Sequence, residues 1–347
     1  DAPTRGETIH EAVSADGVHF AKRTDPILPL DYREFDDVNP DLFPNAAGTG
    51  WHLSISGWKV FDSPDLKSWT ENRAFASPRD LPRWICCSIF AWNGWHYYAG
   101  CGYYRVSRDP VAPGWRWREP EHPATRDGLG VPKIAAFKDN RFLLAGFLCP
   151  VFGGELVFRE LVQHADGTLG TKFPPEMTPP CGAPRAAAFV DADGADAVTD
   201  DGTLRLDGGV QSACARLDDP PAAFRLTARV APEAGVVALG FAFRGVPGAP
   251  NGFALRVEPA AGRVSFVPCE EGRPAGEPVR VIEDVTGLDQ PFDLDLFALS
   301  GLIDVCLDGR RTIIARIPEA CVGRRLFVFA EGGGVVFDRL TFREVVS

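Results

Sequence analysis

Residues 88–100 read SIFAWNGWHYYAG, two short apolar runs separated by an Asn-Gly turn signal. Such a pattern predicts two antiparallel strands joined by a tight hairpin. Related strand-turn-strand patterns occur at residues 41–57 and 135–146. In each copy the first strand ends in a phenylalanine, and these phenylalanines are 47 residues apart: Phe43, Phe90 and Phe137. The first half of the chain is therefore an internal repeat.

The repeat is long enough to hold more than a hairpin. In the first copy a third strand leads into Ser63–Trp69, and in the second copy Ser107–Pro110 takes the same place. Units of about 45 residues with several antiparallel strands are typical of β-propeller blades. Residues 9–20 match only the third-strand part of this unit. We therefore predict three complete blades and the outer part of a fourth, with a two-sheet sandwich of coincidental spacing as the alternative.

The blade pattern ends near residue 178, and a different β-pattern begins near residue 185. Alternating runs such as Phe224–Val230 and Gly252–Val257 are typical of strands with one face buried against a second sheet. The sequence thus predicts an all-β chain with two domains. A five-bladed-type β-propeller, N-terminally incomplete in this chain, occupies residues 1–178, and a β-sandwich occupies residues 185–347.

The composition is that of a globular protein, with 45% hydrophobic and 24% charged residues among 347 and a net charge of −11. The acidic balance argues against a nucleic-acid partner, because phosphate binding requires a basic surface. No stretch approaches the roughly 18–20 apolar residues of a membrane span. The nine cysteines lack C-x-x-C spacing. They favour buried thiols over disulfides or zinc, and the cytoplasm over secretion.

The chain begins with Asp1, and no apolar signal-peptide region is visible after it. A cleaved leader, and with it secretion, stays open as the alternative. An unclosed propeller leaves unpaired strand edges, which is energetically costly. We therefore expect an upstream segment, a partner chain or a variant closure to complete the propeller.

Several stretches resemble motifs of glycoside hydrolase family 32, the invertase, levanase and inulinase group. Ser63–Trp69 resembles the family's Ser-Pro-Asp-Leu-x-x-Trp blade signature, and Val157–Leu161 resembles its Pro-Arg-Glu-Leu element. Ile303–Thr312 and Phe327–Gly333 resemble two strands of the family's sandwich. The resemblance covers essentially the whole chain. It implies a five-bladed propeller with a C-terminal sandwich, and activity on fructosides.

The resemblance also shows where the family's three catalytic carboxylates should lie. A retaining glycosidase needs a nucleophile and an acid/base, and the family's nucleophile motif, Asn-Asp-Pro-Asn, is absent from this chain. Aligning Pro40 with the family's Arg-Asp-Pro motif puts Asn39 at the aspartate. Aligning Trp84 with Trp-Glu-Cys-Pro-Asp-Leu-Phe puts Ile85 at the acid/base. Because isoleucine transfers no proton, the family's double displacement is not available to these residues.

Two carboxylates, Asp36 and Asp37, precede the stretch aligned with Arg-Asp-Pro and lie at the expected inner edge of a blade. If the protein is an enzyme, we predict a non-standard catalytic set that uses Asp36, Asp37 or groups on an upstream segment. Solvated loop carboxylates are the alternative. Asp109, in a literal Arg-Asp-Pro, follows a third strand and is predicted as a turn residue. We expect no cofactor and no metal, because the histidines share no ligand spacing: His19, His52 and His96.

Four further residues are predicted to bind substrate. Trp84 offers an aromatic face for a sugar ring, with core packing as the alternative. Arg159 and Glu160 form a pocket-rim pair, or else a structural ion pair. Asn39 completes the set through its position in the aligned motif.

The sequence thus predicts a carbohydrate-active protein whose partner is an oligosaccharide or glycoside, and leaves open whether it is an enzyme. The leading hypothesis is action on, or binding of, a fructoside or related glycan in the propeller funnel. A non-catalytic glycan-binding protein derived from such an enzyme is one alternative. A related propeller glycosidase acting on arabinose- or xylose-containing glycans is the other.

Overall fold

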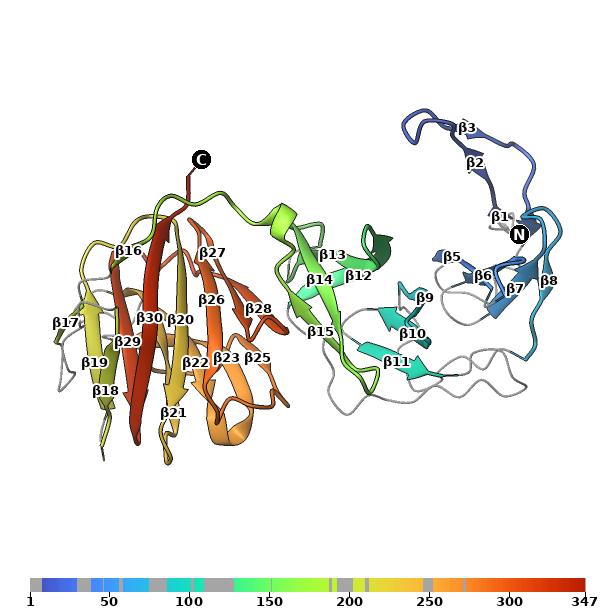
Figure 1. The fold of residues 1–347 in the computed structure, drawn as a ribbon. Coiled ribbons are helices and arrows are strands. Elements are labelled where there is room, and N and C mark those ends of the chain that lie inside the picture. Colours follow the sequence, from blue (N-terminus) through green and yellow to red (C-terminus); the bar gives the residue numbers. More distant parts are fainter. Residues whose placement is uncertain are drawn as a thin grey trace, which may run out of the picture. The chain divides into compact units, whose positions relative to one another are not determined.

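The computed structural model describes residues 8–29, 39–45, 47–55, 59–74, 86–100, 103–108, 128–150, 152–186, 189–191, 202–209, 212–245, 252–270 and 273–346. These residues form strands, turns and short 3-10 helices, with no α-helix among them, which confirms the predicted all-β class (Figure 1). No helix in this part of the chain is long and apolar enough to cross a membrane. The chain divides into two compact units, residues 1–121 with 131–134, and residues 122–130 with 135–347.

In the first unit, short strands follow one another as antiparallel meanders. One sheet has four strands in chain order: β5 (Pro40–Pro44), β6 (Trp51–Ile55), β7 (Lys59–Ser63) and β8 (Thr70–Glu71). The next sheet has three: β9 (Ser88–Trp92), β10 (Trp95–Gly100) and β11 (Tyr103–Ser107). Two short pairs precede them: β1 (Thr8–Ile9) with β4 (Leu28–Pro29), and β2 (Ala12–Val13) with β3 (Ala21–Lys22). The first, second and third strands predicted for two repeats are all present.

A Ser-x-Asp turn recurs in this unit with the same hydrogen bonds. Asp65 Oδ1 accepts the backbone N–H groups of residues 67 and 68, both at 2.8 Å. Asp16 Oδ1 accepts those of residues 18 and 19, also at 2.8 Å. In both turns the aspartate N–H donates to the serine Oγ two residues earlier, at 3.3 Å. The turn after β2 is therefore equivalent to the turn after β7, as the match of residues 9–20 to the blade pattern predicts.

The third repeat also folds as predicted. Its strands form a four-stranded meander in chain order: β12 (Leu129–Phe137), β13 (Arg141–Leu148), β14 (Leu156–Gln163) and β15 (Leu169–Lys172). Most of this sheet belongs to the same compact unit as the C-terminal region. The domain boundary predicted between residues 178 and 185 stays a prediction.

Two large antiparallel sheets follow and face each other in the second unit (Figure 1). The first has seven strands: β16 (Arg185–Ala186), β18 (Leu204–Asp207), β30 (Gly334–Glu344), β20 (Phe224–Pro232), β26 (Phe292–Ala298), β27 (Leu302–Leu307) and β28 (Arg311–Arg316). The second has eight: β17 (Val190–Asp191), β19 (Ser212–Leu217), β29 (Arg325–Glu331), β21 (Ala238–Gly245), β22 (Gly252–Glu258), β23 (Arg263–Glu270), β24 (Arg273–Pro274) and β25 (Arg280–Ile282).

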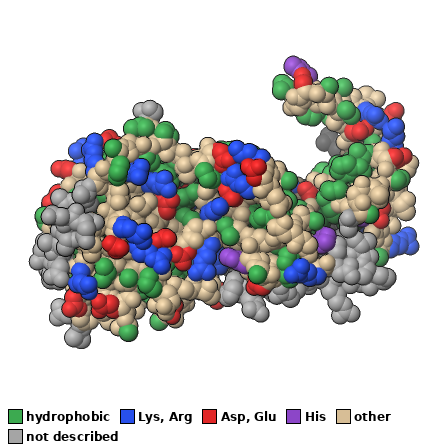
Figure 2. Space-filling view, viewed as in Figure 1, with side chains coloured by type: hydrophobic (Ala, Val, Ile, Leu, Met, Phe, Trp, Pro, Cys, Tyr) green, Lys and Arg blue, Asp and Glu red, His purple; other side chains and the backbone are tan. Residues whose placement is uncertain are grey.

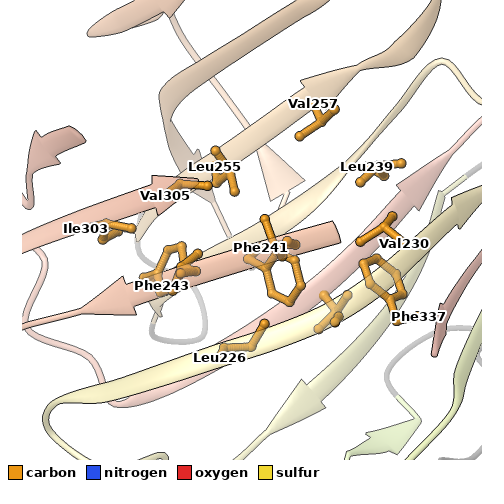
Figure 3. Packing of buried hydrophobic residues seen from close by; sticks show 14 of the residues in the cluster. Leu226, Val230, Leu239, Phe241, Phe243, Leu255, Val257, Ile303, Val305 and Phe337 are labelled. Atoms are coloured by element: carbon orange, nitrogen blue, oxygen red, sulfur yellow. The ribbon is translucent and has the colours of Figure 1, made fainter. Parts of the chain in front are cut away.

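The core of the sandwich follows from the alternation along its strands. On β20 every second residue from Phe224 to Val230 is buried, and on β21 the inward residues are Leu239, Phe241 and Phe243. Figure 3 shows these side chains meeting between the sheets, where Phe241 packs edge-on against Phe337 at 5.5 Å. Each such side chain stabilises the fold by about 1.5–3 kcal/mol on burial. The residues between them on β20, including Arg225 and Arg229, are half-buried. The face in Figure 2 shows acidic and basic groups interspersed on the surface.

Candidate functional site

The residues predicted from the family motifs fall partly outside the described part of the chain. Asp36, Asp37 and Trp84 lie outside the described residues, so their catalytic and stacking roles stay predictions. Asn39 is described: it directly precedes β5 and is half-buried.

The first strands of the repeats are joined by polar side chains at equivalent positions. Asp41 on β5 accepts the backbone N–H of Ile89 on β9, with 2.7 Å between Oδ2 and N. Ser88, 47 residues after Asp41, accepts the N–H of Ile134 on β12, with 3.2 Å between Oγ and N. Each side chain satisfies a backbone donor that would otherwise interrupt the packing of neighbouring strands.

A lysine, Lys133, lies close to the Asp41 carboxyl that makes the first of these bonds. Lys133 Nζ donates to the Cys87 carbonyl oxygen at 2.7 Å, and its charge acts on the Asp41 carboxyl. Burial raises the pKa of Asp41, although the Ile89 bond and the Lys133 charge both oppose it. Burial also raises the pKa of the Cys87 thiol, to about 11, and that of the Tyr98 hydroxyl. We call this set the inner-strand cluster: Asp41, Cys87, Ser88, Tyr98 and Lys133.

The inner-strand cluster holds a carboxyl whose pKa lies above the ordinary aspartate value. The raised pKa values of Cys87 and Tyr98 keep both groups neutral beside it. A carboxyl of raised pKa is what a general acid requires. Sequence reasoning used Asp41 only as a landmark of the repeat and missed it as a site residue. The available signal was its polarity, since the equivalent position of the third repeat holds Ala135.

Arg159, predicted as a substrate-binding residue, lies on β14 and is 1% exposed. Its guanidinium donates two hydrogen bonds to the Asp304 carboxylate, at 2.9 and 2.6 Å, and one to Thr312 Oγ1 at 3.0 Å. It also lies over the ring of Phe173, 5.5 Å from the centroid. These contacts form a structural ion pair with Asp304, not the pair with Glu160 that the sequence left open as the alternative. Substrate binding by Arg159 stays a prediction.

Glu160, the neighbouring residue on β14, has other partners than Arg159. Arg141 donates to Glu160 Oε2 at 2.5 Å, and Lys172 Nζ lies 3.1 Å from Oε1. Burial raises the pKa of this carboxyl, but the hydrogen bonds and charges of Arg141 and Lys172 outweigh it and leave the pKa below its usual range. Glu160 is therefore ionised at neutral pH and poorly suited to donate a proton.

Described residues of the second unit line at least two cavities. One of about 300 Å³ is lined by the turn between β14 and β15 and by sandwich loops, with His164, Asp166 and Asp284 on its wall. The other, of about 460 Å³, lies at one end of the sandwich. No group of three or more His, Cys, Asp or Glu residues in the described part of the chain is arranged to hold a metal ion.

Neither a family model nor a curated protein matches the sequence, but solved structures resemble the fold. A family 32 β-fructofuranosidase from Bombyx mori is 14% identical, with a TM-score of 0.60 over 96% of this chain and 71% of that one. The exo-inulinase of Aspergillus awamori is 12% identical, with a TM-score of 0.62 over 97% and 74% of the two chains. The sucrose-6-phosphate hydrolase of Lactobacillus gasseri is 14% identical, with a TM-score of 0.60 over 95% and 71%.

At identities this low, the structural likeness establishes the fold alone, and the activity must be argued from individual residues. The likeness extends through the blade-like sheets and the sandwich alike. The chain therefore has the all-β fold of the family 32 glycoside hydrolases, propeller blades followed by a β-sandwich.

Proposed function

We propose that the protein recognises a fructoside or a related glycan at the inner strands of its blades. The observation that carries the proposal is the fold, which extends over at least 95% of the chain in a β-fructofuranosidase, an exo-inulinase and a sucrose-6-phosphate hydrolase. Fold alone does not transfer activity, so the residues of the inner-strand cluster must supply the recognition.

Asp41 has one oxygen to offer a ligand. Its Oδ2 is occupied by the Ile89 N–H, whereas its Oδ1 accepts no hydrogen bond from the described residues. A sugar hydroxyl requires such an acceptor, and the nearby charge of Lys133 keeps the carboxyl polarised. This supports Asp41 as the glycan-contacting residue of the inner-strand cluster.

Two forms of the proposal differ in chemistry. The raised pKa of Asp41 supports hydrolysis, with Asp41 as proton donor and Asp36 or Asp37 as the second carboxylate. Ile85 and Asn39, where the family has carboxylates, support binding without hydrolysis. Both forms predict glycan binding, and only the first predicts turnover.

The test measures binding and turnover on the same preparation. Calorimetric titration with sucrose, inulin and levan, beside arabinan and xylan, reports binding, and released monosaccharide reports hydrolysis. Asp41→Asn retains an acceptor for Ile89 but removes the ionisable group, and Asp37→Ala removes the predicted partner. Asp25→Asn, an exposed carboxylate after β3, is the matched control.

We expect Asp41→Asn to weaken fructan binding, or to abolish turnover, while Asp25→Asn changes neither. Turnover that survives in Asp37→Ala would remove Asp37 from the mechanism. Binding of arabinan or xylan in preference to the fructans would replace the substrate class. Absence of binding to all five glycans would refute the proposal.

A further inference from the structure

The larger of the two cavities lies at one end of the sandwich, where strands of both sheets line it. Its floor consists of core residues at the strand ends: Phe224 on β20, Phe243 on β21 and Leu326 on β29 are each less than 5% exposed. Figure 3 shows Phe243 at the end of the buried cluster, near Ile303. Residues 219–222 and 322–324 also line the cavity and form its rim. The volume of about 460 Å³ is within the range of small-molecule sites.

Arg244 at the rim is held in an unusual backbone conformation. Its φ is 56°, a left-handed value that glycine, asparagine or aspartate adopts at lower cost. It occurs at a register shift between Phe243 and Gly245 where β21 pairs with β29. Such bulges turn a side chain away from its regular direction, and they are frequent beside binding sites.

The bulge fastens Arg244 to two loops of the rim. Its guanidinium donates to the Ser300 carbonyl oxygen at 2.8 Å, and its own carbonyl accepts the Gly323 N–H at 3.2 Å. Within the described residues the guanidinium donates only the hydrogen bond to Ser300, which leaves most of its five N–H donors available. Arg244 is therefore positioned before any ligand arrives.

The rim is basic in a chain that is acidic overall. Three arginines line the cavity, Arg244, Arg324 and Arg325, against one carboxylate, Asp219. Arg325 is 3.3 Å from Asp218, a carboxylate that it shares with Arg216. Arg324 is exposed and has no ion pair within the described residues. An arginine fork over an apolar floor matches a carboxylate or phosphate carried on a compact ring or chain.

We propose that this cavity binds a small organic anion, whose carboxylate or phosphate group meets Arg244 and Arg324 while its body covers the apolar floor. A sugar acid, a sugar phosphate and a cyclic carboxylic acid share this chemistry. The proposal involves no residue of the inner-strand cluster, so its test is independent of glycan recognition there.

The test titrates the full chain with D-glucuronate, D-glucose 6-phosphate and cyclohexanecarboxylate, with D-glucose as the neutral probe. We expect at least one anion to bind at least about tenfold more tightly than D-glucose, as one charge-assisted hydrogen bond allows. The anion that binds most tightly shows whether the cavity prefers a carboxylate or a phosphate group. If no anion binds, or if D-glucose binds as tightly as the best anion, the proposal is wrong.

Two variants locate the binding. Arg324→Gln should weaken binding of the best anion by at least about tenfold, whereas Arg343→Gln, at an exposed arginine of β30, should leave it unchanged. Arg244→Gly removes the guanidinium yet suits the left-handed backbone, so anion affinity should fall without a loss of thermal stability. Equal weakening by Arg324→Gln and Arg343→Gln would place the binding elsewhere and overturn the proposal.

Discussion

Arg159 and Asp304 lie 145 residues apart in the chain and are joined by two parallel hydrogen bonds, which link β14 of the third blade sheet to β27 of the sandwich. The Arg159 side chain is 2% exposed and that of Asp304 is 14% exposed. Thr312 and Thr171 extend the contact, with 2.7 Å between their hydroxyl oxygens. The bidentate geometry fixes orientation as well as distance, which lysine at this position would not do.

Arg159→Met should destabilise the second unit by about 3–5 kcal/mol, because it leaves the Asp304 carboxylate buried without its partner. Urea unfolding followed by fluorescence measures the loss. Arg159→Met combined with Asp304→Leu should recover much of it, since neither charge then remains. If the double variant is no more stable than the single one, the loss comes from packing rather than from the unpaired charge.

Gly240→Ala should destabilise the sandwich by at least about 1–3 kcal/mol, the cost of overpacking. A Cβ at Gly240 would overlap the Leu255 carbonyl oxygen of the neighbouring strand and press on the Phe329 ring. Gly301→Ala is the matched control, because nothing lies within 4 Å of its Cβ position, and it should change stability by less than about 0.5 kcal/mol. Similar unfolding midpoints for the two variants would contradict the packing described for β21 and β22.

Asp41→Asn should become more stable relative to the unmodified chain as pH rises from the ordinary aspartate range. The folded state raises the pKa of Asp41, so between the unfolded and folded pKa values the folded chain holds a proton that the unfolded chain has lost. Stability of the unmodified chain therefore declines through this window. Urea midpoints measured from about pH 4 to pH 7, with Asp25→Asn as control, test the sign. A difference that does not change with pH would show that the Asp41 pKa is not raised.

Glu160→Gln should show the opposite pH dependence. The folded state lowers the pKa of Glu160, so its contribution is present above the ordinary glutamate pKa and is lost as pH falls through the folded value. The variant should cost about 1–3 kcal/mol at neutral pH, because charged hydrogen bonds from Arg141 and Lys172 are weakened, and the cost should shrink in acid. Glu319→Gln, at an exposed glutamate, should cost little at any pH. A cost that persists in acid would assign the effect to packing.

The strands of the blades were predictable because their signals are local. The 47-residue repeat predicts the ends of β5, β9 and β12 to within two residues, and apolar runs with turn residues predict β6, β10 and β13. In the sandwich, alternation predicts β20 and β22 closely, Phe224–Pro232 and Gly252–Glu258. Strand order was not predictable, since β30 pairs with β16, β18 and β20 across long stretches of chain.

The site was harder to predict because its contacts are not local. No spacing in the sequence connects Arg159 with Asp304 or Lys133 with Asp41. Family motifs direct attention to Asp36, Asp37 and Trp84, which lie outside the described residues. Titration of Asp41 depends on burial by neighbouring strands, which appears only once the strands are assembled.

The left-handed backbone of Arg244 has a consequence for how this protein changes over generations. A single base change converts every arginine codon into a glycine codon, and glycine relieves the backbone cost at this position. The backbone energy at this position alone would therefore favour the replacement. Sequences of natural variants therefore record selection at this one codon. If arginine is retained there although glycine costs less backbone energy, the arginine side chain is in use.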